Sequence, residues 1–402
     1  MKNKGVLVLC TVIITGFLLC TFVITMYAFW DTKTISEKEN RRLSEKPELT
    51  VAGWFDGKYT LELSSFLNDH IGGRNEILDM ASGYQSLLKQ SQNMEIRGNN
   101  ADNGNADMSD NLILNDRILM LNIKNREYNE KFVKNANKIY KSLPKGIEKY
   151  LVLSPSRIEF EEEQYKKYSD SQKKSIAYLY QKISNDVTKI DTYTYVESAT
   201  KSYDLNELYF RTDHHWTHLC SAYAANAILQ TMGFKMKNPD DYVKTRYGDF
   251  LGYLYAFNNM TEEDGYVPDD LDVYDIGMDV PEEIHTFDEN GNSVVINEFV
   301  NDPSRAGYYT FVRGSYSHVI IDGKKEGGKN LLMLNDSYAN TLVTWLTEDY
   351  DTIVMIDPRY YKGGKKEFEA LLKENDINQF MICLCDVSTQ VALAGELENF
   401  TK

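Results

Sequence analysis

The residues best suited to do chemistry in this chain lie in one hexapeptide and at one later serine. Asp213-His214-His215-Trp216-Thr217-His218 holds three of the six histidines of the chain. An Asp two residues before a His can orient the imidazole and balance its charge, as the general base of an acyl-transfer enzyme requires. Ser337 supplies a candidate nucleophile. The residue types therefore predict a catalytic arrangement of Ser337, His215 and Asp213.

Ser337 stands where the apolar run Leu331-Leu332-Met333-Leu334 gives way to a polar turn and a helical pattern. A serine at this point lies at the carboxyl edge of an α/β sheet, where ligands bind. Its backbone N–H would lie at a helix N-terminus, which favours a developing oxyanion. The alternative is an ordinary helix N-cap, since Asp and Ser are preferred at that position.

The histidine cluster has two alternative interpretations. Asp213 could cap the following helix beside partly buried imidazoles. His214 and His218 are four residues apart and could share a helix face with Asp213 nearby, as in a zinc or iron site. However, the helix is expected to begin near Thr217, and no Glu lies between the histidines to act as a base. We therefore expect no metal, with His214 and His218 in structural or substrate-facing positions.

Several other residues are weaker candidates for binding substrate or an oxyanion. Arg359 comes after an expected strand and the pair Asp357-Pro358. Gly314 follows another expected strand, where it could let the backbone approach a ligand. Asn340 lies about one helical turn beyond Ser337. The glycine-bracketed segment Tyr247–Gly252 could wall a pocket. A purely structural role is an equal alternative for each of them.

The elements that must position these residues alternate between buried strands and helices. This alternation predicts an α/β domain over residues 111–402, with a mainly parallel central sheet flanked by helices. Acidic residues 261–300 break the pattern, and Asp288-Glu289-Asn290-Gly291-Asn292 predicts a β-hairpin excursion. The expected helices are 125–143, 171–187, 219–232, 338–346 and 366–374, and the expected strands are 149–153, 190–196, 308–313, 317–322, 331–335, 352–356 and 380–385.

The N-terminal region predicts a membrane anchor. Lys2 and Lys4 precede an uncharged run over residues 5–30, and about 25 helical residues at ~1.5 Å each can cross a hydrocarbon core of ~30 Å. Aromatic residues at the end of the run are typical of a membrane interface. We expect residues 1–4 to form a cytoplasmic tail, 5–30 an uncleaved single-pass signal anchor in the cell membrane, and 31–110 a juxtamembrane helical segment and linker. Cleavage after the apolar run is the alternative.

Composition narrows the classes of partner. The net charge of −16 argues against binding to a nucleic-acid backbone, which requires Lys and Arg. Of the five cysteines, Cys383 and Cys385 alternate in a strand-like run, where they are expected to be buried apolar residues. Cys220 stands alone after the histidine cluster. No disulfide framework is expected.

The chain resembles the DHHW family of Gram-positive surface proteins, which is similar to the SGNH-hydrolase-like proteins that O-acetylate alginate and other exopolysaccharides. The resemblance is carried by four motifs and covers most of the chain beyond residue 30. One departure is Asn335, where the acetylation proteins have Gly before Asp-Ser; Asn tolerates a left-handed backbone better than most residues. The motifs are Arg211–Thr217, Gly248–Gly252, Asn335–Asn340 and Asp357–Tyr361.

The resemblance implies an SGNH-like fold and an extracytoplasmic O-acetyltransferase acting on a cell-surface or secreted polysaccharide. Asp213 would orient His215, His215 would act as the base, and Ser337 would carry the acetyl group. A membrane-bound O-acyltransferase is the implied acetyl donor, and no cofactor is implied. The alternatives are a glycan acetylesterase with the same triad, and a catalytically silent glycan-binding or assembly protein on the same fold.

Overall fold

The computed structural model describes most of the chain beyond residue 108. The described residues are 15, 23, 25–31, 33–36, 41–50, 54, 58–72, 74, 94–98, 109–276, 283–288, 291–296, 307–312, 316–323 and 327–402. Contacts divide the chain into two compact units: Met1–Gln92, Asn100–Asn105 and Ala256–Gly265 form one, and the remaining residues form the other. The candidate catalytic residues all belong to the second unit.

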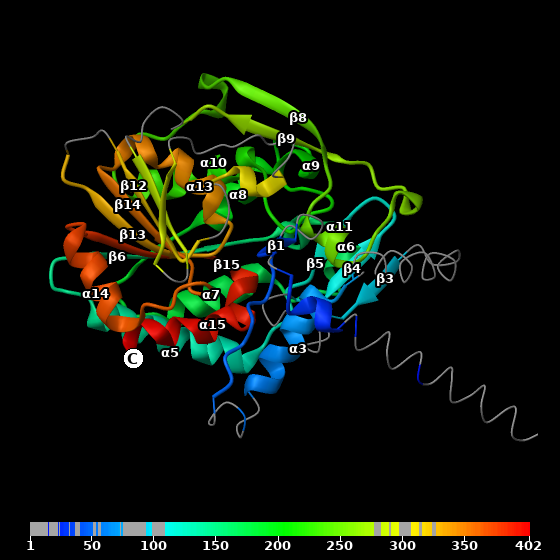
Figure 1. The fold of residues 1–402 in the computed structure, drawn as a ribbon. Helices are drawn as coiled ribbons and strands as arrows, with labels where there is room; N and C mark the ends of the chain where they lie inside the picture. Colours follow the sequence, from blue (N-terminus) through cyan, green and yellow to red (C-terminus); the bar gives the residue numbers. More distant parts are fainter. Residues whose placement is uncertain are drawn as a thin grey trace, which may run out of the picture. The chain divides into compact units, whose positions relative to one another are not determined.

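A mixed central sheet organises the second unit (Figure 1). In the part of the chain that the structure describes, it has eight strands. Five neighbouring strands run parallel to one another, whereas the three at one edge pair antiparallel. In spatial order the strands are β11 (Ser293–Ile296), β10 (Glu283–Phe287), β12 (His318–Asp322), β14 (Thr352–Ile356), β13 (Asn330–Asn335), β15 (Gln379–Cys385), β6 (Glu148–Ser154) and β7 (Thr188–Ile190).

Helices cover both faces of this sheet, as Figure 1 shows. One layer contains α5 (Arg126–Ser142), α7 (Gln172–Lys182), α14 (Gly364–Glu374) and α15 (Leu393–Glu396). The other contains α8 (Thr192–Ala199), α10 (His218–Thr231) and α13 (Ala339–Leu342). The expectation of an α/β domain with a central sheet flanked by helices is confirmed.

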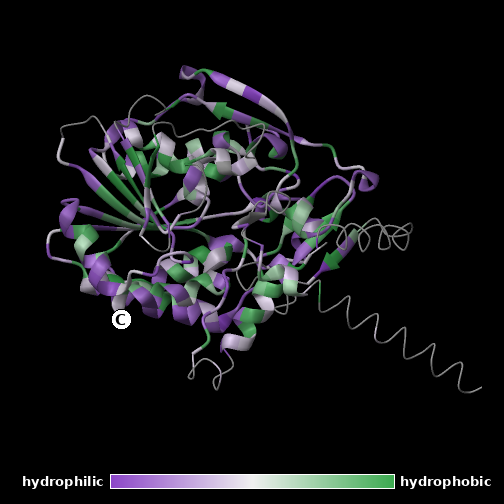
Figure 2. Cartoon of the chain, viewed as in Figure 1, coloured by the Kyte–Doolittle hydropathy of each residue, from purple (hydrophilic) through white to green (hydrophobic). Residues whose placement is uncertain are grey.

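The core lies between the sheet and the layer of α5, α7 and α14. Phe132 and Ile139 of α5, Leu179 of α7 and Phe368 of α14 pack against fully buried strand residues such as Phe380. Figure 2 shows these strands as mostly hydrophobic. Because strands buried on both faces have few polar positions, they appear in the sequence as continuous apolar runs, which is why their positions could be predicted.

Two expected strands are wrong. The segment 190–196 contributes only Ile190 to β7 and then forms α8, whose N-cap Asp191 accepts a hydrogen bond from the Thr194 N–H at 3.0 Å. In the segment 308–313, Gly307–Thr310 is a 3₁₀ helix and Val312 has a φ of +56°, which an extended strand does not accommodate. Arg313 lies outside the described residues.

The hairpin expected around 288–292 is confirmed by its two strands, and residues 289 and 290 lie outside the described ones. It joins β10 to β11, and the Asp288 N–H donates to the Asn292 carbonyl at 3.0 Å. It extends the central sheet at its antiparallel edge instead of leaving the domain. Nearby in the sequence, β8 (Lys244–Phe250) and β9 (Asp269–Tyr274) form a separate antiparallel pair, with α11 (Tyr253–Phe257) following β8.

Smaller elements complete the second unit. They are the three-stranded sheet of β3 (Met94–Arg97), β4 (Asn111–Leu114) and β5 (Ile118–Met120), and the short helices α6 (Glu163–Lys166) and α9 (Leu205–Leu208). Cys220, Cys383 and Cys385 are buried thiols without a disulfide, as expected for small apolar residues.

The first unit is organised around α3 (Lys58–His70). Its Phe66 ring lies 5.6 Å from that of Phe29, and His70 bonds the Asp31 carboxylate at 3.2 Å and the Ser44 carbonyl at 2.9 Å. A short pairing of β1 (Ile35–Ser36) with β2 (Arg41–Arg42) belongs to the same unit.

The expected anchor over residues 5–30 lies mostly outside the described residues, and the expected tail over residues 1–4 lies wholly outside them. Among the residues that are described, no helix combines the length and the apolar character needed to cross a membrane.

Candidate catalytic site

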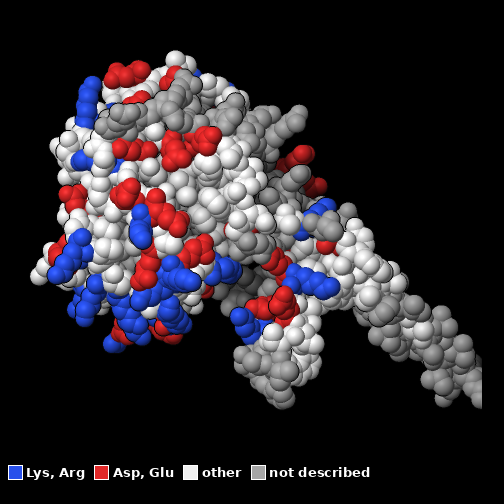
Figure 3. All heavy atoms as spheres, turned by 60° about the vertical axis from the view of Figure 1, so that its left-hand side comes forward, with Lys and Arg blue, Asp and Glu red and all other residues white. Residues whose placement is uncertain are grey.

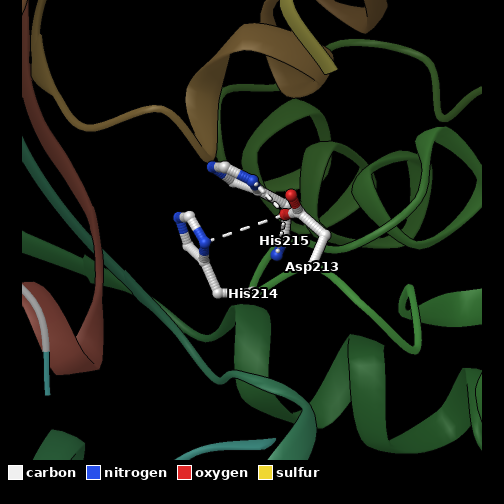
Figure 4. A group of neighbouring side chains, drawn as sticks. All are labelled: Asp213, His214 and His215. Carbon is white, nitrogen blue, oxygen red and sulfur yellow. Dashed lines mark hydrogen bonds and ion pairs between the residues drawn. The ribbon is translucent and has the colours of Figure 1, made fainter. Parts of the chain in front are cut away.

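The structure brings Asp213, His215 and Ser337 into one hydrogen-bonded chain. The Ser337 Oγ lies 2.7 Å from His215 Nε2, and His215 Nδ1 lies 2.6 Å from Asp213 Oδ1. Figure 4 shows the His215 ring turned toward the Asp213 carboxylate. Because an ionised carboxylate only accepts hydrogen bonds, Nδ1 carries the ring proton and Nε2 accepts from the Ser337 hydroxyl. This is the tautomer that a general base needs.

The Asp213 carboxylate is buried and fully engaged. Besides the His215 ring, Oδ1 accepts the His215 backbone N–H at 2.9 Å, and Oδ2 accepts the Tyr253 N–H at 2.7 Å. Burial by itself would raise the pKa of Asp213. The electrostatic effect of His215 and His214 on the carboxylate and these hydrogen bonds outweigh burial, so the pKa of Asp213 lies well below the usual range. Asp213 therefore remains ionised.

Gly252 makes room for the Asp213 carboxylate. A Cβ at position 252 would lie 2.3 Å from the Asp213 Cβ, closer than side chains approach. The Gly252 N–H donates to Thr212 Oγ1 at 3.1 Å, directly before Asp213. Gly252, the last residue of the segment Tyr247–Gly252 that could wall a pocket, is therefore packed against the carboxylate of the triad.

Asp269, the first residue of β9, fixes the start of the histidine motif. Its carboxylate accepts the Arg211 backbone N–H at 2.8 Å, the Arg211 Nε–H at 2.7 Å and the Thr212 N–H at 3.3 Å. Two adjacent segments thus hold the residues just before Asp213: the end of β8 with α11, and β9.

Tyr308 supports the His215 ring from one face. The two rings stack with centroids 3.8 Å apart and planes 7° from parallel. The Tyr308 hydroxyl donates to the Ser337 carbonyl at 3.2 Å, and the tyrosine is almost fully buried. Tyr308 therefore contacts both the base and the backbone of the candidate nucleophile.

Further contacts join the histidine motif to the Ser337 segment. Trp216 Nε1–H donates to the Tyr338 carbonyl at 3.0 Å and to Thr341 Oγ1 at 2.9 Å. The Tyr338 hydroxyl donates to the His214 carbonyl. Trp216 is fully buried, so its indole N–H needs such a partner. These bonds fix the distance between the two segments.

The turn that presents Ser337 is held by Asp336. Its carboxylate accepts the Tyr338 N–H at 3.0 Å, the Cys385 N–H at 2.7 Å and the Ser388 hydroxyl at 2.6 Å. Burial raises the pKa of Asp336, although these hydrogen bonds act against it. Asp336 therefore ties the turn after β13 to the end of the neighbouring strand β15.

Asn335 does not use the left-handed conformation considered for it. Its φ is not positive, and its side-chain amide donates to the Asp336 carbonyl at 3.0 Å. A glycine is not needed at this position for backbone reasons. In the described part of the chain, no backbone hydrogen-bond partner is found for the Ser337 N–H, and its role as an oxyanion donor stays a prediction.

His214 lies beside the triad. Its ring centroid is 3.8 Å from that of His215, and its Nδ1 is 3.8 Å from Asp213 Oδ1. Burial and the unfavourable interaction with a neighbouring His215 imidazolium lower the pKa of His214 to about 3, against the raising effect of Asp213, so the ring is neutral near pH 7.

The ligand atoms of Asp213, His214 and His215 lie within 4.8 Å of one another, a spacing that could also hold a metal ion. The hydrogen bond from Ser337 to His215 favours a triad, because a serine nucleophile accounts for the orientation of both side chains.

His218 lies in a structural position, and the alternative in which it shares a metal ion with His214 does not hold. Its Nδ1 accepts the Tyr274 N–H at 3.1 Å, and its Nε2 bonds Thr344 Oγ1 at 2.8 Å. Both nitrogens are occupied, and burial lowers the pKa of His218 to about 3. The helix α10 begins only at His218, which separates the two histidines.

The remaining candidates are placed less closely. Arg359 bonds the Asp357 carboxylate at 3.0 and 2.6 Å, and its charge lowers the pKa of both His214 and Asp336, so it lies within electrostatic reach of the site. Asn340 is buried, and its backbone N–H donates to the Ser337 carbonyl at 3.2 Å. Gly314 lies outside the described residues. For all three, substrate binding stays a prediction.

Comparison with known protein families assigns this chain to one of them. A model of the DHHW protein family matches residues 125–356, more than half of the chain. The chain belongs to the DHHW family. No curated protein sequence matches it. The resemblance inferred from the motifs is therefore confirmed for the family.

Solved structures confirm the fold of this DHHW protein. A DHHW family protein from Eubacterium siraeum aligns with a TM-score of 0.63 and 23% identity, over 73% of this chain and 95% of that one. Bacillus cereus PatB1 with a sulfonyl adduct aligns with a TM-score of 0.57 and 18% identity, over 73% and 98%. The O-acetyltransferase domain of Pseudomonas putida AlgJ aligns at a TM-score of only 0.35 and 12% identity, over 68% and 89%.

Gly252→Ala should slow the reaction of Ser337 by about 100-fold, because the new methyl displaces Asp213 and a displacement of about 1 Å can cost that much. The measurement is the rate at which a fluorophosphonate probe labels Ser337, followed by intact mass. Gly395→Ala is the control, since a Cβ there meets open space. Equal labelling rates in both variants would show that the close approach does not matter.

Tyr308→Leu should slow labelling by about tenfold, because the protonated His215 ring loses the aromatic face that stabilises a cation. Tyr308→Phe keeps the ring and should stay within about threefold of wild type. If the phenylalanine variant slows labelling as much as the leucine variant does, the stacked aromatic ring is not what supports His215.

Proposed function

We propose that this DHHW protein is an O-acetyltransferase that moves an acetyl group to a hydroxyl of a cell-surface or secreted polysaccharide through an acetyl-serine intermediate. The observation that carries the proposal is the continuous chain from Ser337 Oγ through His215 to Asp213, with spacings of 2.7 and 2.6 Å. Family membership supports the fold on which this chain is built.

The first half-reaction loads the serine. His215 Nε2 takes the proton of the Ser337 hydroxyl while Oγ attacks the acetyl carbonyl carbon of the donor. The negative charge that develops on the carbonyl oxygen is stabilised by the Ser337 N–H. His215 then returns the proton to the leaving group, and Ser337 carries the acetyl ester.

The second half-reaction uses the same base. A sugar hydroxyl gives its proton to His215 Nε2, and its oxygen attacks the acetyl-serine carbonyl. The Ser337 oxygen leaves, takes the proton from His215 and regenerates the starting state. Throughout, the Asp213 carboxylate compensates the charge of the His215 imidazolium and keeps the proton on Nδ1.

The proposal extends to location and donor. We propose that the uncharged run over residues 5–30 anchors the protein in the cell membrane, with the α/β domain outside the cytoplasm. A membrane-bound O-acyltransferase would then present acetyl groups on the same side. The anchor is supported by the sequence pattern alone, and the donor only by the resemblance to polysaccharide O-acetylation systems.

The test is intact-protein mass spectrometry after exposure to an activated acetyl ester. Wild type should gain one acetyl group at Ser337. In Ser337→Ala and His215→Ala, acylation should be at least about 1,000-fold slower. Ser198→Ala, an exposed serine on α8, is the matched control and should behave as wild type.

The fate of the adduct separates the possible functions. Transfer of the acetyl group to an added polysaccharide supports the transferase. Release of the acetyl group as acetate, at the same rate with and without polysaccharide, would show that the protein is an esterase and not a transferase. Absence of any Ser337-dependent adduct would overturn catalysis and favour a silent glycan-binding protein.

A further inference from the structure

The outer face of α5 carries a row of lysines that the catalytic site does not use. Lys131, Lys134, Lys138 and Lys141 recur at intervals of three and four residues, and all four are exposed. Such spacing places them along one side of a helix. Phe132, Ala136 and Ile139 on the opposite side are buried, so packing fixes the row toward solvent. We call these four residues the lysine row.

Most of the row lacks a neutralising partner. Lys131 pairs with Glu127 at 2.7 Å. Among the residues that the structure describes, Lys134, Lys138 and Lys141 have no carboxylate within 4 Å. The pKa of Glu398 is lowered mainly by its bond to Lys402, at 2.9 Å, and only to a smaller extent by the charges of Lys138 and Lys134. Positive charge is thus concentrated on α5 although the whole chain carries −16.

Positively and negatively charged side chains are also segregated on the surface of the α/β domain. Figure 3 shows Lys and Arg side chains gathered at the lower margin of the α/β domain, the side on which Figure 1 places α5 and α14. Acidic side chains are more frequent above that margin. A local basic surface on an acidic protein attracts an anionic partner to that face in particular.

An exposed aromatic ring lies on α7, the helix beside α5. Tyr178 of α7 is 42% exposed, and the ammonium groups of Lys124 and Lys182 lie 5.7 and 5.5 Å from its ring. The α7 helix is held next to α5 by the Asn137 side chain, which donates to the Lys182 carbonyl at 3.0 Å. Aromatic rings pack against the C–H faces of sugars, and lysines bind their acidic groups.

The direction of α5 connects the row to the catalytic edge. The N-terminal end of α5 is tied to the segment after β15, since the Asn125 N–H donates to Gln390 Oε1 at 3.0 Å. The last residue of β15, Cys385, donates to Asp336, the neighbour of Ser337. A chain molecule lying along α5 therefore leads toward the carboxyl edge of the sheet, where Ser337 lies.

We propose that the lysine row binds a linear polysaccharide with a carboxylate on each sugar. Successive lysines rise by about 4.5–6 Å along the helix, comparable to the length of one sugar unit in an extended glycan. A membrane surface fits less well, because the described part of α5 exposes no large apolar side chain to insert among lipids. The inference concerns binding and does not depend on the proposed acetyl transfer.

The experiment measures binding of the full chain to polygalacturonate by calorimetry in 50 and 200 mM salt. Wild type should bind, and the affinity should fall by at least about tenfold between the two salt concentrations, because several charges are neutralised together. The triple variant Lys134→Gln/Lys138→Gln/Lys141→Gln should weaken binding at least tenfold. Ser337→Ala should bind as wild type, which separates this surface from the catalytic proposal.

The matched control is Lys167→Gln/Lys201→Gln/Lys235→Gln, which removes the same charge from exposed lysines elsewhere. It should stay within about twofold of wild type, with both triple variants showing wild-type circular dichroism. Equal losses in the two triple variants would mean that net charge alone matters and would overturn the proposal. So would absence of wild-type binding, or tighter α5-dependent binding to anionic phospholipid vesicles than to polygalacturonate.

Discussion

The buried carboxylate of Asp213 is the constraint on which the site depends. Removing an ionised carboxylate from water costs several kcal/mol unless hydrogen bonds and opposite charge replace the lost hydration. The protein supplies the backbone N–H groups of His215 and Tyr253 and the ring of His215. Once the carboxylate is satisfied in this way, the ring proton is held on Nδ1, and Nε2 can only accept. In that tautomer the Ser337 hydroxyl is the donor of the hydrogen bond to Nε2, as its position 2.7 Å away allows.

The histidine motif, the Ser337 turn and the segment of Tyr308 must come together to form the site. The histidine motif is held by Asp269 and by Gly252, the Ser337 turn by Asp336, and the His215 ring by Tyr308. Asp269 is the first residue of β9, Gly252 directly precedes α11, and Asp336 directly follows β13 and bonds the last residue of β15. Rigid elements position reacting groups more precisely than loops do, so the central sheet and the β8–β9 pair determine the precision of the site.

Much of this arrangement could be predicted from the sequence. Strands buried on both faces, such as the run 331–335, are continuous apolar segments, and the pairing of Asp with His two residues later is local. The supports could not be predicted, because they depend on contacts between distant segments. Tyr308 lies in a segment whose residue types favour a strand, yet it belongs to a 3₁₀ helix and its ring stacks on His215. The sequence shows a glycine at position 252, but its contact with Asp213 depends on the fold and could not be predicted.

The tautomer of His215 is the most direct test of this account. Nitrogen NMR of protein labelled with ¹⁵N at histidine distinguishes a protonated ring nitrogen from an accepting one. At neutral pH we expect His215 with its proton on Nδ1 and none on Nε2, and we expect Asp213→Asn to abolish that preference. A proton on Nε2 in the wild-type protein would contradict the account, because the ring could not then accept the proton of Ser337.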